Sequence, residues 1–139
     1  EVYAGLADKV FFSTPEVMSN WLEDAERAAL KAVAVSSWLK GGEELFVEGL
    51  RVEVRASPGH SPGGLVYFLP ALDAAIVGDT IFRRGVGRTD LPGGSFAQLE
   101  DSIRLKIYTL PPSTTLYTGH GPETTVDFER AQNPFVQGI

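Results

Sequence analysis

The sequence predicts one α/β domain, because helix-like and strand-like patterns interleave along a chain of 139 residues. Two stretches place apolar residues at the three- and four-residue spacing of a helix. The remaining stretches are short runs in which apolar residues alternate with polar ones or follow one another, as in strands. Hydrophobic residues make up 43% of the chain and no repeat or linker interrupts it, so we expect a single structural unit.

A short strand is predicted at residues 2–4, followed by a helix that ends near Lys31. Thr14 is suited to the N-cap of this helix, Pro15 to its first position and Glu16 to its first turn. The apolar face at helical spacing consists of Met18, Trp21, Leu22, Ala25 and Ala29.

A hairpin is predicted after Gly41, with its turn at Gly49 and alternating strands on either side. The alternating apolar residues are Leu45 and Val47 before the turn, and Val52, Val54 and Ala56 after it. Two short apolar runs then predict buried strands at 65–69 and 74–77, separated by a turn near Pro70.

A long loop is expected from residue 79 to residue 94, and a second helix follows it. Ser95 is suited to the N-cap of this helix, and Gln98 completes a capping-box pattern. The residues expected on its buried face are Phe96, Leu99, Ile103 and Ile107. The last predicted elements are a strand at 115–117 and a short helix around 127–132.

Composition restricts the class of partner. The formal net charge is −6, with 18 acidic and 12 basic residues, whereas nucleic-acid binding depends on Lys and Arg neutralising phosphates. No run approaches the roughly 18 apolar residues of a membrane span. The absence of cysteine excludes disulfides and thiolate metal sites. We therefore expect no nucleic-acid or membrane partner, and a cytoplasmic location.

The only two histidines in the chain lie in turns rich in Gly and Pro, next to predicted strands. His60 lies in the segment 57–63 and His120 in the segment 118–122, while Asp79 follows the apolar run 74–77. Two imidazoles and a carboxylate are ligands that suit zinc or iron. Each residue also has a plainer reading, as a surface histidine or an Asx-turn aspartate. The spacing alone leaves these readings open.

Four segments occur in the order seen in metallo-β-lactamase-fold hydrolases, and they resemble the glyoxalase II-like branch most. They read SPGHSPG at 57–63, GDTIF at 78–82, GRTDLPGGS at 87–95 and GHGPETT at 119–125. The tail at 130–135 is similar to the ending of that branch. This resemblance implies that residues 1–139 form one partial domain, the C-terminal part of an αββα sandwich.

By this resemblance His60 would bind a first metal and His120 a second. Asp79 would be the catalytic carboxylate that bridges them. A complete site would hold two Zn²⁺, or iron or manganese, and would activate water for attack on a thioester or ester carbonyl. Family members carry an earlier His-x-His-x-Asp-His motif, and this chain has none and does not begin with Met. We therefore expect an N-terminally truncated chain with an incomplete metal site and weak or absent hydrolysis.

The resemblance also implies an apolar sheet face left exposed in this chain. We expect the chain to form a homodimer, to exchange elements or to pair with an N-terminal segment. Two further readings of the function stay open. One is an iron persulfide dioxygenase on the same fold, and the other is a catalytically silent module for interaction or oligomerisation.

The loop after Asp79 carries two secondary candidates. Asp90 would accept a hydrogen bond from a ligand histidine and so orient it. Arg88, together with Arg83 and Arg84, would contact an anionic group of the substrate. The plainer alternative is a solvated loop in which Arg88 pairs with Asp90.

Overall fold

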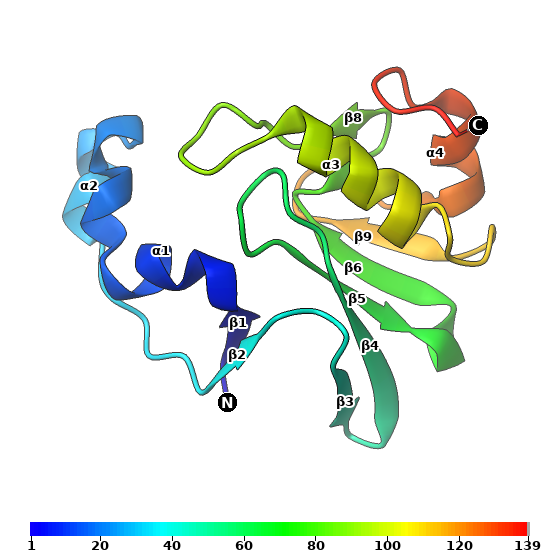
Figure 1. Ribbon diagram of the computed structural model, residues 1–139, viewed down its shortest axis with the longest axis horizontal. Helices are drawn as coiled ribbons and strands as arrows, with labels where there is room; N and C mark the ends of the chain where they lie inside the picture. Colours follow the sequence, from blue (N-terminus) through cyan, green and yellow to red (C-terminus); the bar gives the residue numbers. More distant parts are fainter. Residues whose placement is uncertain (139) are drawn as a thin grey trace.

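A mixed sheet of six strands, in the order β10-β9-β6-β5-β4-β3, forms the centre of the computed structural model, which describes residues 1–138. Helices lie on one face of this sheet, and the N-terminal segment extends away from them (Figure 1). The predicted α/β class is confirmed. No helix in the described part of the chain is long and apolar enough to cross a membrane.

The four middle strands follow the sequence prediction. They are β3 (Glu44–Val47), β4 (Leu50–Ala56), β5 (Leu65–Leu69) and β6 (Ala74–Gly78), and each is antiparallel to the next. The turn between β3 and β4 contains Glu48 and Gly49, whose φ angles are 49° and 82°. Two positive φ angles give the turn a twist that matches the paired strands.

Strand β9 (Thr115–Thr118) lies beside β6 and runs parallel to it, and β10 (Thr124–Thr125) pairs antiparallel with β9. Because β4 and β6 are each antiparallel to β5, the three strands β4, β6 and β9 share one direction. Their carboxyl ends therefore lie at the same end of the sheet.

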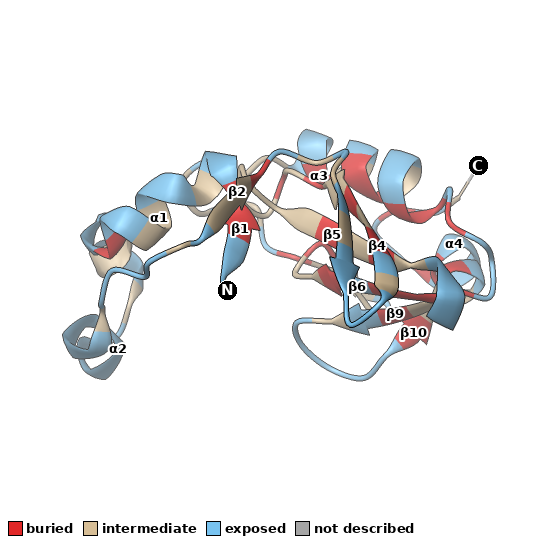
Figure 2. Ribbon diagram, turned by 90° about the horizontal axis from the view of Figure 1, so that it is seen from below, coloured by how far each residue is buried: buried red, intermediate tan, exposed pale blue. Residues whose placement is uncertain are grey.

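The core lies between the sheet and two helices, α3 (Phe96–Ser102), continued by a π-helical segment at Ile103–Ile107, and α4 (Val126–Gln132) (Figure 2). Its fully buried members include Leu99, Ile103 and Ile107 from the helix, and Val66, Val77 and Leu116 from the sheet. Ser95 caps α3 as predicted, since its Oγ accepts a hydrogen bond from the Gln98 amide. The prediction for Phe96 is wrong, because this side chain is 44% exposed. The Ser95 amide donates to the Gly59 carbonyl, so α3 begins over a loop and not over a strand.

The single long helix predicted after Thr14 is not formed. The chain instead makes short pieces, η1 (Leu6–Asp8), α1 (Lys9–Ser13), a 3₁₀ helix at Pro15–Trp21 and α2 (Asp24–Ala29). Thr14 makes no side-chain cap, and the backbone is extended at Leu22 before a capping box of Glu23 and Glu26 starts α2. Pro15 is the one buried residue described in these pieces. An amphipathic face stabilises a helix only where it packs against something.

The sheet face opposite the helices is apolar and partly open. The register places Leu45, Val52, Tyr67 and Ile76 on this face, and Ile76 is 51% exposed. Strand β1 (Tyr3–Gly5), paired in parallel with β2 (Ser37–Leu39), reaches over it, so that Tyr3 helps to line a groove of about 410 Å³. The exposed apolar face expected from the sequence is present.

The predicted loop at 79–94 contains a small hairpin that the sequence analysis missed. Its strands are β7 (Ile81–Phe82) and β8 (Gly85–Val86), and they pair antiparallel. Strands of two residues are too short to show alternation. The turn between them depends on Arg84, which has a positive φ of 58°.

Candidate functional site

The three residues predicted as metal ligands meet at one end of the sheet. His60 lies in the loop after β4, Asp79 directly after β6, and His120 in the turn after β9, so each follows one of the three strands that share a direction. The Nε2 atom of His60 lies 3.4 Å from Oδ2 of Asp79. The Nδ1 atom of His120 lies 3.1 Å from Oδ1 of the same carboxylate. Asp79 therefore contacts one histidine through each of its oxygens.

The His60 ring is oriented by the backbone of the next loop. Its Nδ1 lies 2.8 Å from the carbonyl oxygen of Arg88. A carbonyl can only accept, so Nδ1 carries the proton and Nε2 of the neutral ring has a lone pair. That lone pair faces a carboxylate oxygen of Asp79, and two acceptors so placed call for a positive charge, either a ring proton or a metal ion. A histidine that donates its other N–H to a carbonyl is typical of metal sites.

His120 is held less tightly than His60. Its side chain is 74% exposed, against 27% for His60. The edge of its ring meets the ring of Phe82, with centroids 5.6 Å apart and planes at 81°. The turn that carries it is closed by Thr118, whose hydroxyl donates to the His120 carbonyl.

Two glycines let the backbone approach Asp79 closely. A Cβ atom at Gly119 would lie 2.0 Å from Oδ1 of Asp79, and a Cβ at Gly87 would lie 1.8 Å from the Asp79 carbonyl oxygen and 3.3 Å from the His60 Cβ. Real side chains do not approach so closely, so both positions must lack one for Asp79 to keep its place. Sequence reasoning did not single these glycines out, although both belong to the quoted motifs.

A buried pair of hydroxyl groups joins the loop that carries His60 to the strand end that carries Asp79. Ser57 Oγ and Thr80 Oγ1 are 3.1 Å apart, and the two residues are 1% and 4% exposed. Both border a cavity of about 200 Å³ that His60 and Asp79 also line. Sequence analysis missed this pair, because nothing in the sequence shows that the two hydroxyls face each other.

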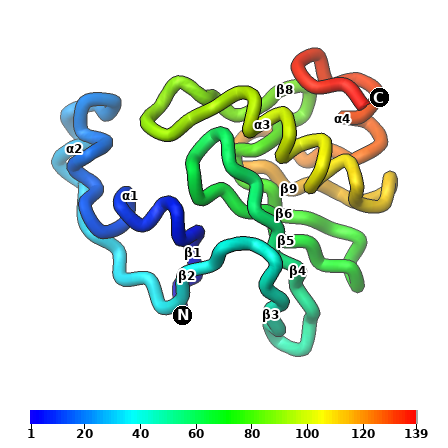
Figure 3. The backbone as a smooth tube through the Cα atoms, in the orientation of Figure 1, coloured from blue at the N-terminus to red at the C-terminus, as the bar shows by residue number. Residues whose placement is uncertain are grey.

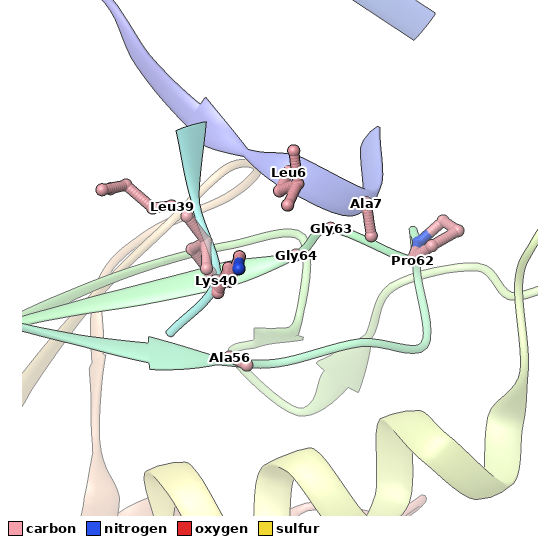
Figure 4. Close-up of a pocket in the computed structure, with 9 residues that line it drawn as sticks. Leu6, Ala7, Leu39, Lys40, Ala56, Pro62, Gly63 and Gly64 are labelled. Atoms are coloured by element: carbon pink, nitrogen blue, oxygen red, sulfur yellow. The ribbon is translucent and has the colours of Figure 1, made fainter. Parts of the chain in front are cut away.

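The N-terminal segment braces the loop that follows His60. Asp8 accepts hydrogen bonds from the Ser61 hydroxyl at 2.6 Å and from the Gly63 amide at 2.7 Å. In Figure 3 this segment passes beside the loop. A cavity of about 290 Å³ lies between the two, with apolar walls that include Leu6 and Leu39 (Figure 4). The N-terminal segment thus helps to shape the site although it supplies none of the three predicted ligands.

The structure corrects the role predicted for Asp90. The Arg88 guanidinium donates to both of its carboxylate oxygens, at 2.7 and 2.8 Å, and so lowers the pKa of Asp90 to about 2. The acceptor that orients His60 is the Arg88 carbonyl and not the Asp90 side chain. The alternative of a solvated Arg88–Asp90 pair is what the structure shows, and a contact of Arg88 with a substrate anion stays a prediction.

The nitrogen–oxygen distances between the two histidines and Asp79 fit parts of two metal sites better than one complete site. Two ligand atoms on a tetrahedral zinc, each about 2.05 Å from it, are separated by about 3.3 Å. The separations of 3.4 and 3.1 Å around Asp79 are similar. Yet no cluster of three or more His, Asp or Glu side chains among residues 1–138 is arranged to hold one ion. Each histidine shares a different oxygen of Asp79, as a bridging carboxylate would require.

Comparison with known proteins covers most of the chain. Residues 4–120 match the metallo-beta-lactamase superfamily. The probable metallo-hydrolase YqgX of Bacillus subtilis is 41% identical over 128 residues, which cover 86% of this chain and 61% of that protein. The hydroxyacylglutathione hydrolase GloC of Haemophilus influenzae is 38% identical over 95 residues, 68% of this chain and 45% of that protein. The chain thus spans less than two thirds of the length of these relatives.

A solved structure shows the same similarity in fold. The crystal structure of TTHA1623 in a di-iron-bound form superposes with a TM-score of 0.81 at 33% identity. The match covers 97% of this chain and 64% of that one.

Proposed function

The chain belongs to the metallo-beta-lactamase superfamily, and from that membership we propose that it forms part of a metal-dependent hydrolase of thioesters or related esters. In this proposal His60 and His120 each bind one metal ion and Asp79 bridges the two. The remaining ligands would come from outside these 139 residues. The substrate is a small molecule, and the protein works in the cytoplasm.

The observation that carries the proposal is the contact of the two Asp79 oxygens with two different histidines. A carboxylate that served only as a hydrogen-bond acceptor would have no need of two histidines from separate strand ends. Hydrogen bonding of His60 to a backbone carbonyl adds to this, because it points Nε2 at the carboxylate.

The residues of this chain would hold the metal ions and orient the ligand side chains. A bound metal pair would lower the pKa of a water molecule and polarise the substrate carbonyl. Arg88 keeps the proton of His60 on Nδ1 and leaves Nε2 to face Asp79. Gly119 lets the backbone approach the Asp79 carboxylate, and Gly87 lets it approach the Asp79 backbone carbonyl. Ser57 and Thr80 tie the two ligand-bearing segments together.

The relatives support the substrate class and leave the metal open. One of them is named a hydroxyacylglutathione hydrolase, whose name denotes hydrolysis of a thioester. A structural neighbour is described in a di-iron-bound form, which supports iron as an alternative to zinc. Imidazole and carboxylate accept zinc, iron and manganese alike.

A second candidate, a catalytically silent module, is favoured by one observation. Among residues 1–138, no group of three or more His, Asp or Glu side chains is arranged so that it could hold one metal ion. Such a module would keep the fold and the histidine contacts and yet bind no metal under conditions that load the relatives.

The deciding experiment is intact mass and metal analysis on one purified sample, followed by a thioester assay with lactoylglutathione. We expect bound metal to depend on Asp79, so that Asp79→Asn loses it. Asp101→Asn is the matched control, because Asp101 is an exposed aspartate on α3. If iron-loaded protein consumed oxygen in the presence of a glutathione persulfide, the result would favour a dioxygenase over a hydrolase. Absence of metal from the chain in excess Zn²⁺, with or without added N-terminal segment, would refute the proposal.

A further inference from the structure

The small hairpin β7–β8 and the two residues that follow it lie against both histidines. Phe82, at the end of β7, meets the His120 ring edge to face. Gly87 directly follows β8 at a place where a Cβ would lie 3.3 Å from the His60 Cβ, and the carbonyl of the next residue, Arg88, accepts from His60 Nδ1. A shift of this hairpin would therefore move groups that contact both imidazoles.

The turn of this hairpin is anchored to α4 by a buried carboxylate. Glu129 is 0% exposed, and its Oε2 accepts from the Arg84 amide at 3.0 Å. Its Oε1 accepts from the Thr124 hydroxyl at 2.6 Å. Asn133, one turn further along the chain and also 0% exposed, donates both to Glu129 Oε2 at 2.9 Å and to the Gly85 carbonyl at 3.1 Å. Two buried side chains thus bind two consecutive backbone groups of the turn.

A buried polar side chain lowers stability unless it is hydrogen-bonded, and each oxygen of Glu129 has a donor. These donors are a hydroxyl and two N–H groups. Arg84 has a left-handed φ of 58°, a conformation that is unfavourable for any residue with a Cβ atom. The hydrogen bond from its amide to Glu129 holds the turn in that conformation.

We propose that Glu129 and Asn133 are positioning residues for the metal-binding histidines, acting through the β7–β8 hairpin. They hold Arg84 and Gly85, and the hairpin in turn places Phe82 against His120 and the Arg88 carbonyl against His60. The structural part of this inference stands without a metal, and its consequence for metal affinity rests on the proposed function.

The test compares Glu129→Met with a variant that weakens the same helix elsewhere. Methionine has about the length of Glu129 but offers no oxygen, so the Arg84 amide, the Thr124 hydroxyl and the Asn133 amide all lose an acceptor. Thr125→Ala is the matched control, since Thr125 Oγ1 caps α4 by accepting from the Phe128 amide, whereas the hydrogen bonds to Arg84 and Gly85 come from Glu129 and Asn133. Both variants are compared at equal global stability, set by temperature.

Three measurements report the outcome: amide hydrogen exchange at Arg84, the NMR signals of the two histidine rings, and the affinity for Co²⁺. In Glu129→Met we expect faster exchange at Arg84, shifted signals from both rings, and about a tenfold or greater loss of Co²⁺ affinity. Thr125→Ala should leave all three close to wild type. Ring signals and affinity that change equally in both variants would overturn the proposal, because the effect would then be general destabilisation.

A rescue variant keeps the test decisive if Glu129→Met folds poorly. Arg84→Gly removes the strain of the positive φ and retains the backbone amide. In the double variant we therefore expect the histidine signals to return toward wild type, and a double variant that shows no return would overturn the proposal. If wild type binds no Co²⁺ while the ring signals still respond to Glu129→Met, the proposed function fails and the positioning role stands.

Discussion

Replacing Gly119 by alanine should displace Asp79 and abolish its role as a bridging ligand. The new Cβ would lie 2.0 Å from Asp79 Oδ1, whereas ordinary contact begins at 3.4 Å. The carboxylate oxygen must therefore move by about 1.4 Å, or the turn that carries His120 must move by as much. Metal–ligand distances tolerate deviations of only about 0.2 Å. We expect metal affinity to fall at least tenfold, or about 1.4 kcal/mol.

The assay is calorimetric titration with Zn²⁺ or Co²⁺, together with urea unfolding of the same sample. Overpacking should also lower the free energy of unfolding by about 1–3 kcal/mol. Gly49→Ala is the control for lowered stability, because Gly49 has a φ of 82° that disfavours a side chain and lies in the β3–β4 turn, outside the site. Unchanged metal affinity in Gly119→Ala, with stability lowered as expected, would refute the assignment of Asp79 as a ligand.

Three further predictions concern the surroundings of the site. Arg88→Met should raise the pKa of Asp90 from about 2 toward its ordinary value, which NMR titration measures. Because folding lowers this pKa, the pair stabilises the protein above about pH 4, and its contribution is lost as the pH falls toward 2. Thr80→Val should lower the free energy of unfolding by about 1–3 kcal/mol, because it leaves the buried Ser57 hydroxyl without its partner. A double variant with Ser57→Ala should lose less than the sum, and simple additivity would argue against the pair. Asp8→Ala should speed amide exchange in the loop after His60, and unchanged exchange would show that this brace is dispensable.

The sheet could be predicted from the sequence wherever an alternating pattern or an apolar run was long enough to indicate a strand. Strands β3 to β6 and their turns were found, because four to seven residues in a row repeated one pattern. The N-terminal helix was wrong for the opposite reason. Its residues follow helical spacing, but the chain breaks into short pieces in which none of the five apolar residues is buried, and Trp21 is 47% exposed.

The site was predicted as a set of residues but not as a set of contacts. The two histidines and Asp79 were candidates because each lies in a turn beside a strand, and the family resemblance implied their roles as ligands. Asp90 was expected to orient a ligand histidine, whereas the group that accepts from His60 is a backbone carbonyl two residues earlier. Backbone carbonyls leave no mark in a sequence, and neither does the anchoring of the hairpin by Glu129.

The clustering of the three residues follows from strand direction. His60 and Asp79 follow β4 and β6, which are separated by one antiparallel strand, so a meander of three strands already brings their carboxyl ends to the same end of the sheet. His120 depends on a different feature, because β9 joins β6 in parallel only through a long connection that contains α3. That connection is held on the sheet by the buried side chains of Leu99 and Ile103. The core that covers one face of the sheet therefore also brings the second histidine to Asp79. Because Ser95 and Ser102 donate to the Gly59 and Pro58 carbonyls, a substitution that loosened α3 would also disturb the loop that carries His60.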